Sequence, residues 1–165
     1  MLKMKRRVNR LKPARLLIWC LFVVSLLAFP YLVYSLTLHL IRFNFDKEYS
    51  PNVLPLTSKN YTSVCGSGKC LLLMFYSPFC GICASFAPVY DTVGQLVQQS
   101  EQLADRVLVS RMNGVEDRRV MDAMGVRGYP TILLFPPDRC EGWVEYEGRH
   151  NESAVLAFVA ANCPP

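Results

Sequence analysis

The sequence lacks charge over one long stretch near its beginning: the 26 residues from Leu16 to Ile41 carry no formal charge. As a helix, this stretch would measure roughly 39 Å, which exceeds the hydrocarbon layer of about 30 Å. The 15 residues before it contain seven lysines and arginines and no acidic residue. The positive-inside rule therefore predicts a basic cytosolic tail over residues 1–15, a membrane helix over residues 16–41, and translocation of everything after residue 41.

A cleaved signal peptide is the alternative interpretation of this stretch. The apolar core of a signal peptide has about 7 to 15 residues and ends in small residues of the A-x-A pattern. The run here is longer, and no good small-x-small pair follows it. We therefore expect an uncleaved single-pass type II anchor, with cleavage as the open alternative.

The rest of the chain lacks clustered positive charge, internal repeats and low-complexity tracts. Seven of the 18 lysines and arginines lie in the tail, so 11 remain against 13 acidic residues, and the body of the protein carries a net charge of about −2. This balance excludes the basic surface expected of a nucleic-acid-binding domain. The absence of internal repeats excludes a solenoid. We expect one folded domain over residues 52–163, joined to the membrane helix by a polar and aromatic linker of residues 42–51.

The pattern of apolar residues predicts alternating strands and helices in this domain. The expected strands are residues 52–56, 70–76, 106–112, 131–135 and 142–148. The expected helices are a short helix or turn at 57–65, a long helix at 80–103 bent by Pro88, a helix at 116–126 that ends at Gly125, and a last helix at 151–162. The run 70–76 is continuously apolar, which is typical of a strand covered on both faces. This order predicts an α/β fold with a mixed central sheet flanked by helices.

Two cysteines, Cys80 and Cys83, stand in the segment SPFCGICASFAP with only Gly81 and Ile82 between them. Cys80 falls where the chain turns from a strand into a helix. The N-terminus of a helix presents unpaired N–H groups and a partial positive charge, which stabilise a thiolate. We therefore expect Cys80 to be a nucleophile. Cys83 lies one turn later on the same side and can attack a mixed disulfide formed by Cys80, so we expect it to be the resolving cysteine.

Zinc binding and a structural disulfide are two other uses of such a motif. Zinc would need two more ligands with similar spacing. Cys65 and Cys70 offer a C-x4-C pair, but Cys70 begins the strand whose end leads to Cys80, so it should lie at the opposite end of the sheet. A structural CxxC bridge would close too short a loop to stabilise the fold much. We expect no metal and no organic cofactor.

From Val53 onward the chain resembles the thioredoxin fold, and more narrowly a catalytic domain of the protein disulfide isomerase family. The resemblance rests on FYSPFCGIC, on Pro88 five residues after the second cysteine, on GVRGYPTILLF and on VEYEGRHNESAVLAFV, in the family's order. It implies a thioredoxin fold and dithiol-disulfide exchange on the cysteines of client proteins. Glutathione or another oxidoreductase would be the electron partner.

Further site residues follow from the resemblance. The resemblance implies a cis Tyr129–Pro130 bond, which is possible because proline removes most of the trans preference. Pro130 would lie against the CxxC motif, and the backbone around Tyr129 would pair with an extended client next to Gly81 and Ile82. Arg149 resembles a family arginine thought to swing toward the resolving cysteine and lower its pKa.

Two positions depart from the family pattern. Met74 stands six residues before the first cysteine, where the family usually has a buried acid, so the proton of Cys83 must leave through water or with the help of Arg149. Slower turnover is the expected consequence. Ile82 stands where disulfide isomerases commonly have histidine and thioredoxins proline, which predicts a reduction potential between about −270 and about −180 mV.

These departures keep two other functions open. One is a membrane-tethered thioredoxin-fold binding or adapter module with weak redox activity, which the replacements Met74 and Ile82 would suit. The other is a bacterial-type periplasmic thiol reductase with the same topology, which the isomerase-like segment GVRGYPT disfavours.

Four further cysteines follow the predicted membrane helix, and we expect them to form structural disulfides in an oxidising lumen. Four cysteines allow three pairings. We favour Cys65 with Cys70 and Cys140 with Cys163.

Two N-glycosylation sequons, at Asn60 (N-Y-T) and Asn151 (N-E-S), also lie beyond the membrane helix. They are consistent with a domain in the lumen. The final residues NCPP are not a retention signal of the KDEL kind, so the compartment stays open. We expect the membrane of the endoplasmic reticulum or of another secretory compartment, with the catalytic domain lumenal.

Overall fold

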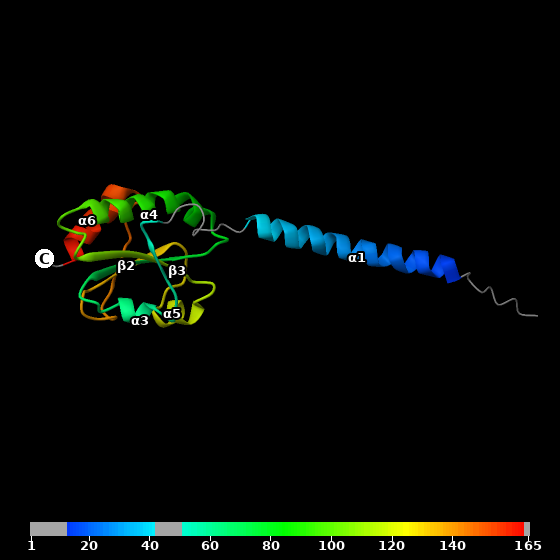
Figure 1. The fold of residues 1–165 in the computed structure, drawn as a ribbon, viewed down its shortest axis with the longest axis horizontal. Helices are drawn as coiled ribbons and strands as arrows, with labels where there is room; N and C mark the ends of the chain where they lie inside the picture. Colours follow the sequence, from blue (N-terminus) through cyan, green and yellow to red (C-terminus); the bar gives the residue numbers. More distant parts are fainter. Residues whose placement is uncertain (1–12, 42–50, 164–165) are drawn as a thin grey trace, which may run out of the picture. The chain divides into compact units, whose positions relative to one another are not determined.

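The computed structural model describes residues 13–41 and 51–163, which belong to two compact units (Figure 1). The first unit contains helix α1, Pro13–Ile41. Within it, the 21 residues Leu17–Thr37 are apolar and exposed, and they are enough to cross a membrane as an anchor or to serve as a signal sequence. Most of the predicted tail (1–15) and nearly all of the predicted linker (42–51) lie outside the described residues.

The second unit is built on a five-stranded mixed sheet. Its strands are β1 (Leu54–Leu56), β2 (Cys70–Tyr76), β3 (Val107–Asn113), β4 (Thr131–Phe135) and β5 (Val144–Glu145). They lie in the order β1-β3-β2-β4-β5. Strands β1, β3 and β2 run parallel, whereas β4 is antiparallel to β2 and β5 to β4. Every residue of the central strand β2 is buried, as its apolar sequence predicts.

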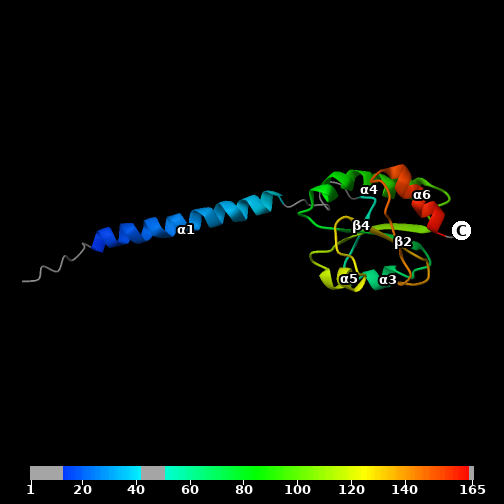
Figure 2. The same cartoon turned by 180° about the vertical axis from the view of Figure 1, so that it is seen from behind.

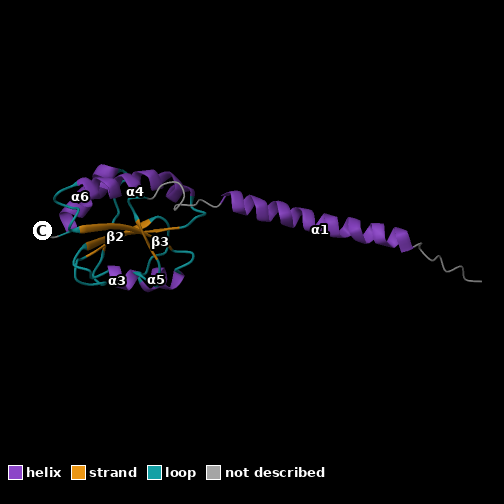
Figure 3. Cartoon of the chain, viewed as in Figure 1, coloured by secondary structure: helices purple, strands orange, loops and turns teal. Residues whose placement is uncertain are grey.

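Helices cover both faces of this sheet. They are α3 (Tyr61–Val64), α4 (Gly81–Gln99), α5 (Arg118–Ala123) and α6 (Glu152–Asn162). Helices α4 and α6 lie on one face and α3 and α5 on the other, in both Figure 1 and Figure 2. Figure 3 shows the strands between these two helical layers. The predicted α/β fold, a mixed sheet flanked by helices, is confirmed.

Alternate residues of β2 face two separate hydrophobic cores, because successive side chains of a strand point to opposite faces. Leu72 and Met74 belong to the core under α4 and α6. Leu71 and Leu73 belong to the core under α3 and α5. The central strand thereby fixes both helical layers and holds the start of α4 at its carboxyl end.

Several helices and strands, α4 and β5 among them, are shorter than the sequence predicts. Helix α4 ends at Gln99 rather than near residue 103, because Ser100 adopts an extended conformation and the following residues form turns. Strand β5 has two residues instead of seven. The N–H of Tyr146 still donates to the carbonyl of Ile132 in β4 at 2.9 Å, and its hydroxyl donates to the carbonyl of Arg149 at 2.5 Å in the loop that follows.

The predicted pairing of the structural cysteines is wrong. The structure joins Cys65 to Cys140 and Cys70 to Cys163, with Cα–Cα distances of 5.3 and 6.1 Å. Cys65 and Cys140 lie with the core on the α3 and α5 side, whereas Cys70 and Cys163 lie with the core on the α4 and α6 side. The sheet therefore separates Cys65 from Cys70 although only four residues lie between them. Each bridge joins cysteines on the same face.

Candidate active site

The CGIC motif lies at the junction between the end of β2 and the start of α4. A turn at Ser77 shapes this junction: its Oγ accepts from the N–H of Phe79 at 3.2 Å, and its carbonyl accepts from the N–H of Cys80 at 3.1 Å. Cys80 is the N-cap residue of α4, and its carbonyl accepts a hydrogen bond from Ala84. The predicted position of Cys80 at a helix N-terminus is confirmed.

A disulfide joins Cys80 to Cys83, with a Cα–Cα distance of 5.2 Å. The backbone N–H of Cys83 donates to the sulfur of Cys80 at 3.1 Å. An N–H group of the first helical turn that points at this sulfur stabilises negative charge there once the bond is reduced. Cys83 is fully buried and Cys80 half-buried. Of the two sulfurs, that of Cys80 is therefore the one that an external thiol or disulfide reaches first.

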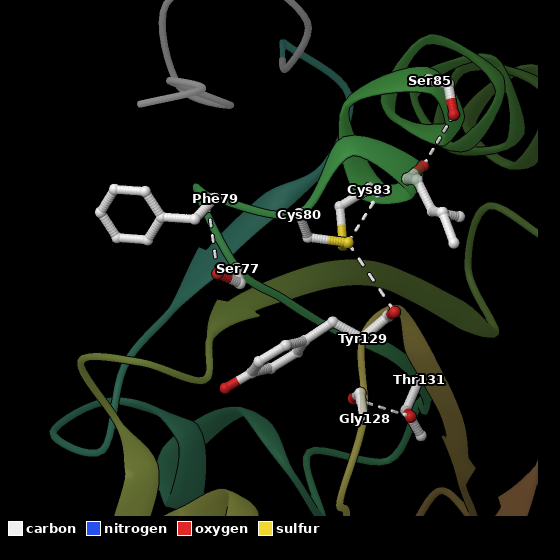
Figure 4. The surroundings of a disulfide bond; sticks show 9 residues. Ser77, Phe79, Cys80, Cys83, Ser85, Gly128, Tyr129 and Thr131 are labelled. Carbon is white, nitrogen blue, oxygen red and sulfur yellow. Dashed lines mark hydrogen bonds between the residues drawn. A yellow bond between two sulfur atoms is a disulfide. The ribbon is translucent and has the colours of Figure 1, made fainter. Parts of the chain in front are cut away.

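The loop before β4 approaches this disulfide from the side of the sheet (Figure 4). The Tyr129–Pro130 bond is cis, as predicted. The carbonyl oxygen of Tyr129 lies 3.7 Å from the sulfur of Cys80. The hydroxyl of Thr131 donates to the carbonyl of Gly128 at 3.1 Å and closes the loop on itself. The loop thus presents backbone groups directly beside the sulfur.

The ring of Tyr129 is held against Gly114, which follows β3. A Cβ atom at Gly114 would lie 2.6 Å from Cε1 of Tyr129 and 2.8 Å from Sδ of Met121, so glycine alone fits without movement of the ring. The N–H of Gly114 donates to the carbonyl of Tyr76 at 2.9 Å. Burial raises the pKa of the Tyr129 hydroxyl, although Arg118 opposes the shift. The Asn113–Gly114 pair is typical of a turn, but the sequence does not show that the ring of Tyr129 lies against Gly114.

The position of the missing acid, Met74, is fully buried and lies opposite Arg111 in the β2–β3 register. Arg111 is 3% exposed, and its Nη1 donates to the carbonyl of Val53. The charged group buried on this face of the sheet is therefore the guanidinium of Arg111, and the carboxylate of the family pattern is replaced by the side chain of Met74. The sequence carries a signal for it, because Arg111 shares the period-two pattern of the buried residues Val107 and Val109.

The remaining predicted site residues lie around the first turns of α4. Gly81 and Ile82 are exposed in its first turn. Arg149 is exposed in the loop before α6. The next residue, His150, packs its ring on Phe86 with a centroid distance of 4.7 Å, about one turn of α4 beyond the CGIC motif. The loop of Arg149 therefore runs beside the part of the helix that carries the two cysteines.

The two sequon asparagines occupy different settings. Asn60 is exposed, and its Oδ1 accepts from the N–H of Thr57 at 2.6 Å. Asn151 caps α6, and its Oδ1 accepts from the N–H of Ala154 at 2.9 Å.

Metal ligands do not gather in the part of the chain that the structure describes: no group of three or more His, Cys, Asp or Glu side chains there could hold an ion. The cysteines weighed as further zinc ligands, Cys65 and Cys70, are both in disulfides. Neither offers the free thiolate that zinc requires.

Comparison with known proteins gives one family. A family model described as thioredoxin matches residues 52–161. Protein disulfide isomerase-like 2-1 of Oryza sativa subsp. japonica is 34% identical over 108 residues, which cover 66% of this chain and 28% of the relative. Protein disulfide-isomerase 1 of Caenorhabditis elegans is 34% identical over 116 residues, which cover 70% and 23%. The chain therefore spans less than a third of either relative.

A solved structure shows the same architecture. It is the first thioredoxin domain of mouse Protein disulfide-isomerase A4, with a TM-score of 0.62 and 23% sequence identity. The match covers 74% of this chain and 85% of that one. At this identity the likeness concerns the fold.

Proposed function

Because the chain belongs to the thioredoxin family, we propose that it is a membrane-anchored, disulfide isomerase-like thiol-disulfide oxidoreductase that acts on protein cysteines. The observation that carries the proposal is the setting of Cys80. Its half-buried sulfur lies at the N-terminus of α4, accepts the N–H of Cys83 and lies 3.7 Å from the carbonyl oxygen of Tyr129. This setting activates a thiolate and leaves one side of it open to a client.

The two cysteines divide the reaction between them. In the reducing direction, the Cys80 thiolate attacks a client disulfide, a Cys80–client bond forms, and the other client sulfur leaves as a thiolate and takes up a proton. Cys83 then loses its proton and attacks the sulfur of Cys80. The Cys80–Cys83 bond forms again, the second client sulfur leaves, and two electrons have passed to the client. Oxidation of a client is the reverse, and isomerisation uses both directions.

We assign client binding to the loop of Tyr129 and Pro130 and to the exposed residues Gly81 and Ile82. An extended client that pairs with the loop backbone would be placed beside the sulfur of Cys80. We assign Arg149 the role of a pKa modulator, since its guanidinium, brought close to the resolving cysteine, would favour the thiolate and lower its pKa. Glutathione or another oxidoreductase would restore the redox state of the pair.

We place the domain in the lumen of the endoplasmic reticulum or of another secretory compartment, anchored by α1 in type II orientation. The apolar helix Leu17–Thr37 and the basic residues before it support this placement, and two structural disulfides suit an oxidising compartment. Protease added to sealed microsomes should remove an N-terminal tag and spare the domain. Digestion of the domain would contradict the topology, and loss of α1 from the mature chain would favour a signal peptide.

Trapping of clients tests the activity directly. In a Cys83→Ala variant the mixed disulfide on Cys80 cannot be resolved, so clients should accumulate as adducts that reductant releases. The variant that carries both Cys80→Ala and Cys83→Ala is the matched control. Adducts no more abundant than in this control would contradict the proposal.

A second candidate is a membrane-tethered adapter with weak redox activity, which the buried Met74 and the exposed Ile82 favour. Insulin reduction and the refolding of a scrambled disulfide protein separate the two functions. An adapter would perform no better than the variant without both cysteines, whereas an oxidoreductase would exceed it in at least one assay.

A further inference from the structure

Residues 42–165 contain a single histidine, His150, in the loop before α6. Met74 and Ile82, the two positions that depart from the family pattern, hold side chains that do not titrate. Histidine ordinarily changes its charge between about pH 5 and 8, and its imidazole is the side chain most often used to accept a proton near neutrality. The place of His150 in the fold decides whether it can serve the two cysteines.

The ring of His150 packs on α4, the helix that begins at the CGIC motif. It lies against the ring of Phe86 at a centroid distance of 4.7 Å. Phe86 follows Cys83 by three residues, and both belong to the same buried core. Residues three apart share one face of a helix, and side chains lean toward the N-terminus of the helix, so Phe86 leans toward the turn of Cys83. His150 therefore covers the face of α4 on which Cys83 is buried.

Hydrogen bonds on both sides of His150 hold its loop in place. The carbonyl of Arg149 accepts from the hydroxyl of Tyr146 at 2.5 Å and from the N–H of Asn151 at 2.8 Å. The Oδ1 of Asn151 accepts from the N–H of Ala154 in the first turn of α6 at 2.9 Å. The backbone before and after His150 is thus fixed, which keeps the imidazole at α4.

The two cysteines differ in their need for a proton acceptor. The thiolate is the attacking form of either cysteine. Cys80 caps α4, whose N-terminus stabilises its thiolate. Cys83 lies inside the first turn and is fully buried, so its proton has no direct contact with bulk water. His150 is exposed and can pass a proton on to the solvent.

Few charges surround the imidazole. Helix α4, against which it packs, has no charged side chain from Gly81 to Tyr90. The titratable side chains in this stretch are Cys83 and Tyr90, and the hydroxyl of Tyr90 donates to backbone carbonyls in the core. Asp91, the next residue, is hydrogen-bonded to Asn52. The charged residues in the loop and in the first turn of α6 are Glu147, Arg149 and Glu152.

We propose that His150 accepts the proton of Cys83, through one water molecule, when the pair resolves a mixed disulfide. This role rests on the proposed oxidoreductase function and names a residue for its second step. The thiol proton of Cys83 passes to the water, and the water gives a proton to the imidazole. The Cys83 thiolate attacks Cys80, the Cys80–Cys83 bond forms, and the client sulfur leaves with the electron pair of the broken bond and takes up a proton. The imidazolium then returns its proton to the solvent.

The test separates the two steps of one turnover. Reduced full-length protein in lipid nanodiscs is mixed with excess glutathione disulfide, so that Cys80 takes up glutathione and Cys83 then releases it. Acid quenching, alkylation and mass spectrometry follow both steps. His150→Phe keeps a ring against Phe86 but removes the proton acceptor. We expect release about tenfold slower at about pH 7.5, less than the roughly hundredfold effect of a directly bonded base, because a water intervenes. Uptake should not change, because the helix N-terminus activates Cys80.

The pH profile distinguishes a proton acceptor from a structural role. The ratio of release rates, parent over His150→Phe, should fall from about ten toward one as the pH drops to about 5, because a protonated imidazole accepts no proton. Glu147→Gln, which removes a charge from the same loop, should leave both steps unchanged. A ratio near one at both pH values, a ratio that rises as the pH falls, or equal slowing of uptake and release would overturn the inference. A parent that takes up no glutathione on Cys80, or that never forms the Cys80–Cys83 bond, would instead contradict the proposed function.

Discussion

The two structural disulfides cross-link the domain so that the stability each adds depends on the other. Cys65–Cys140 spans 75 residues and Cys70–Cys163 spans 93. Taken singly, the chain-entropy relation gives about 4.5 kcal/mol for the first loop and about 4.6 kcal/mol for the second. These values apply only when the other bridge is absent, because the two loops overlap.

With both bridges present, the ring that the second one closes is much shorter. It runs from Cys65 to Cys70, a sequence separation of 5, through one bridge, from Cys163 back to Cys140, a separation of 23, and through the other bridge, which makes a ring of about 28 residues. A ring of that size contributes about 3.6 kcal/mol. Replacing either pair by alanine should therefore lower the free energy of unfolding by about 3.6 kcal/mol, and replacing both pairs by about 8 kcal/mol.

Urea unfolding of the full chain in detergent measures these differences. Trp143 packs on Phe135 at a centroid distance of 5.5 Å, so its fluorescence reports the domain once Trp19 of α1 is replaced by phenylalanine. Cys70 and Cys163 are 1% and 5% exposed, so replacing them also removes buried side-chain packing. A larger loss of unfolding free energy for this pair than for Cys65 and Cys140 would measure that packing, beyond the loop entropy of about 3.6 kcal/mol that both pairs share. A loss below about 1 kcal/mol for either pair would refute the reasoning. So would a variant without both pairs that is no less stable than the single-pair variants.

Three further predictions concern single positions. Met74→Glu, opposite Arg111, should shorten the lifetime of the mixed disulfide in quenched reactions about a hundredfold relative to Met74→Gln, because a carboxylate can accept the proton of the resolving thiol. Burial raises the pKa of Tyr90 well above 10, so the unfolded chain releases this proton first. The urea concentration at the midpoint of unfolding should therefore decrease as the pH rises above about 10, and the decrease should be smaller in Tyr90→Phe. Asn151→Ala should lower the free energy of unfolding by about 1 kcal/mol through loss of the helix cap, whereas Ser153→Ala, which also removes the sequon, should not.

The order of strands and helices could be predicted because each is encoded locally. Seven consecutive apolar residues have the length and composition of a strand buried on both faces, and β2 is that strand. The position of Cys80 at the start of a helix followed from the amphipathic spacing after it. The end of α4 could not be placed as well, because Leu103 continues the apolar pattern while the backbone at Ser100 ends the helix.

Features that depend on which helix covers which face of the sheet could not be read from the sequence. The alternation of β2 separates Leu71 from Leu72, but it does not say that Cys163 returns to the same side as Cys70. The disulfide pairing failed for this reason. The buried position of Arg111 was overlooked for a related reason, since a charged residue in a strand is usually placed at the surface until the covering helix is known.

The six cysteines of the domain form three disulfides, and their settings explain why only one is suited to exchange. Each structural bridge includes a cysteine that is 5% exposed or less and spans 75 residues or more, so attack is hindered and reduction would cost much stability. The bridge between Cys80 and Cys83 spans three residues, so the fold loses little when it opens. Its half-buried sulfur lies at a helix N-terminus that stabilises the thiolate formed by reduction. As the proposed oxidoreductase, the domain would exchange this bond repeatedly while the other two, on opposite faces of the sheet, keep it folded.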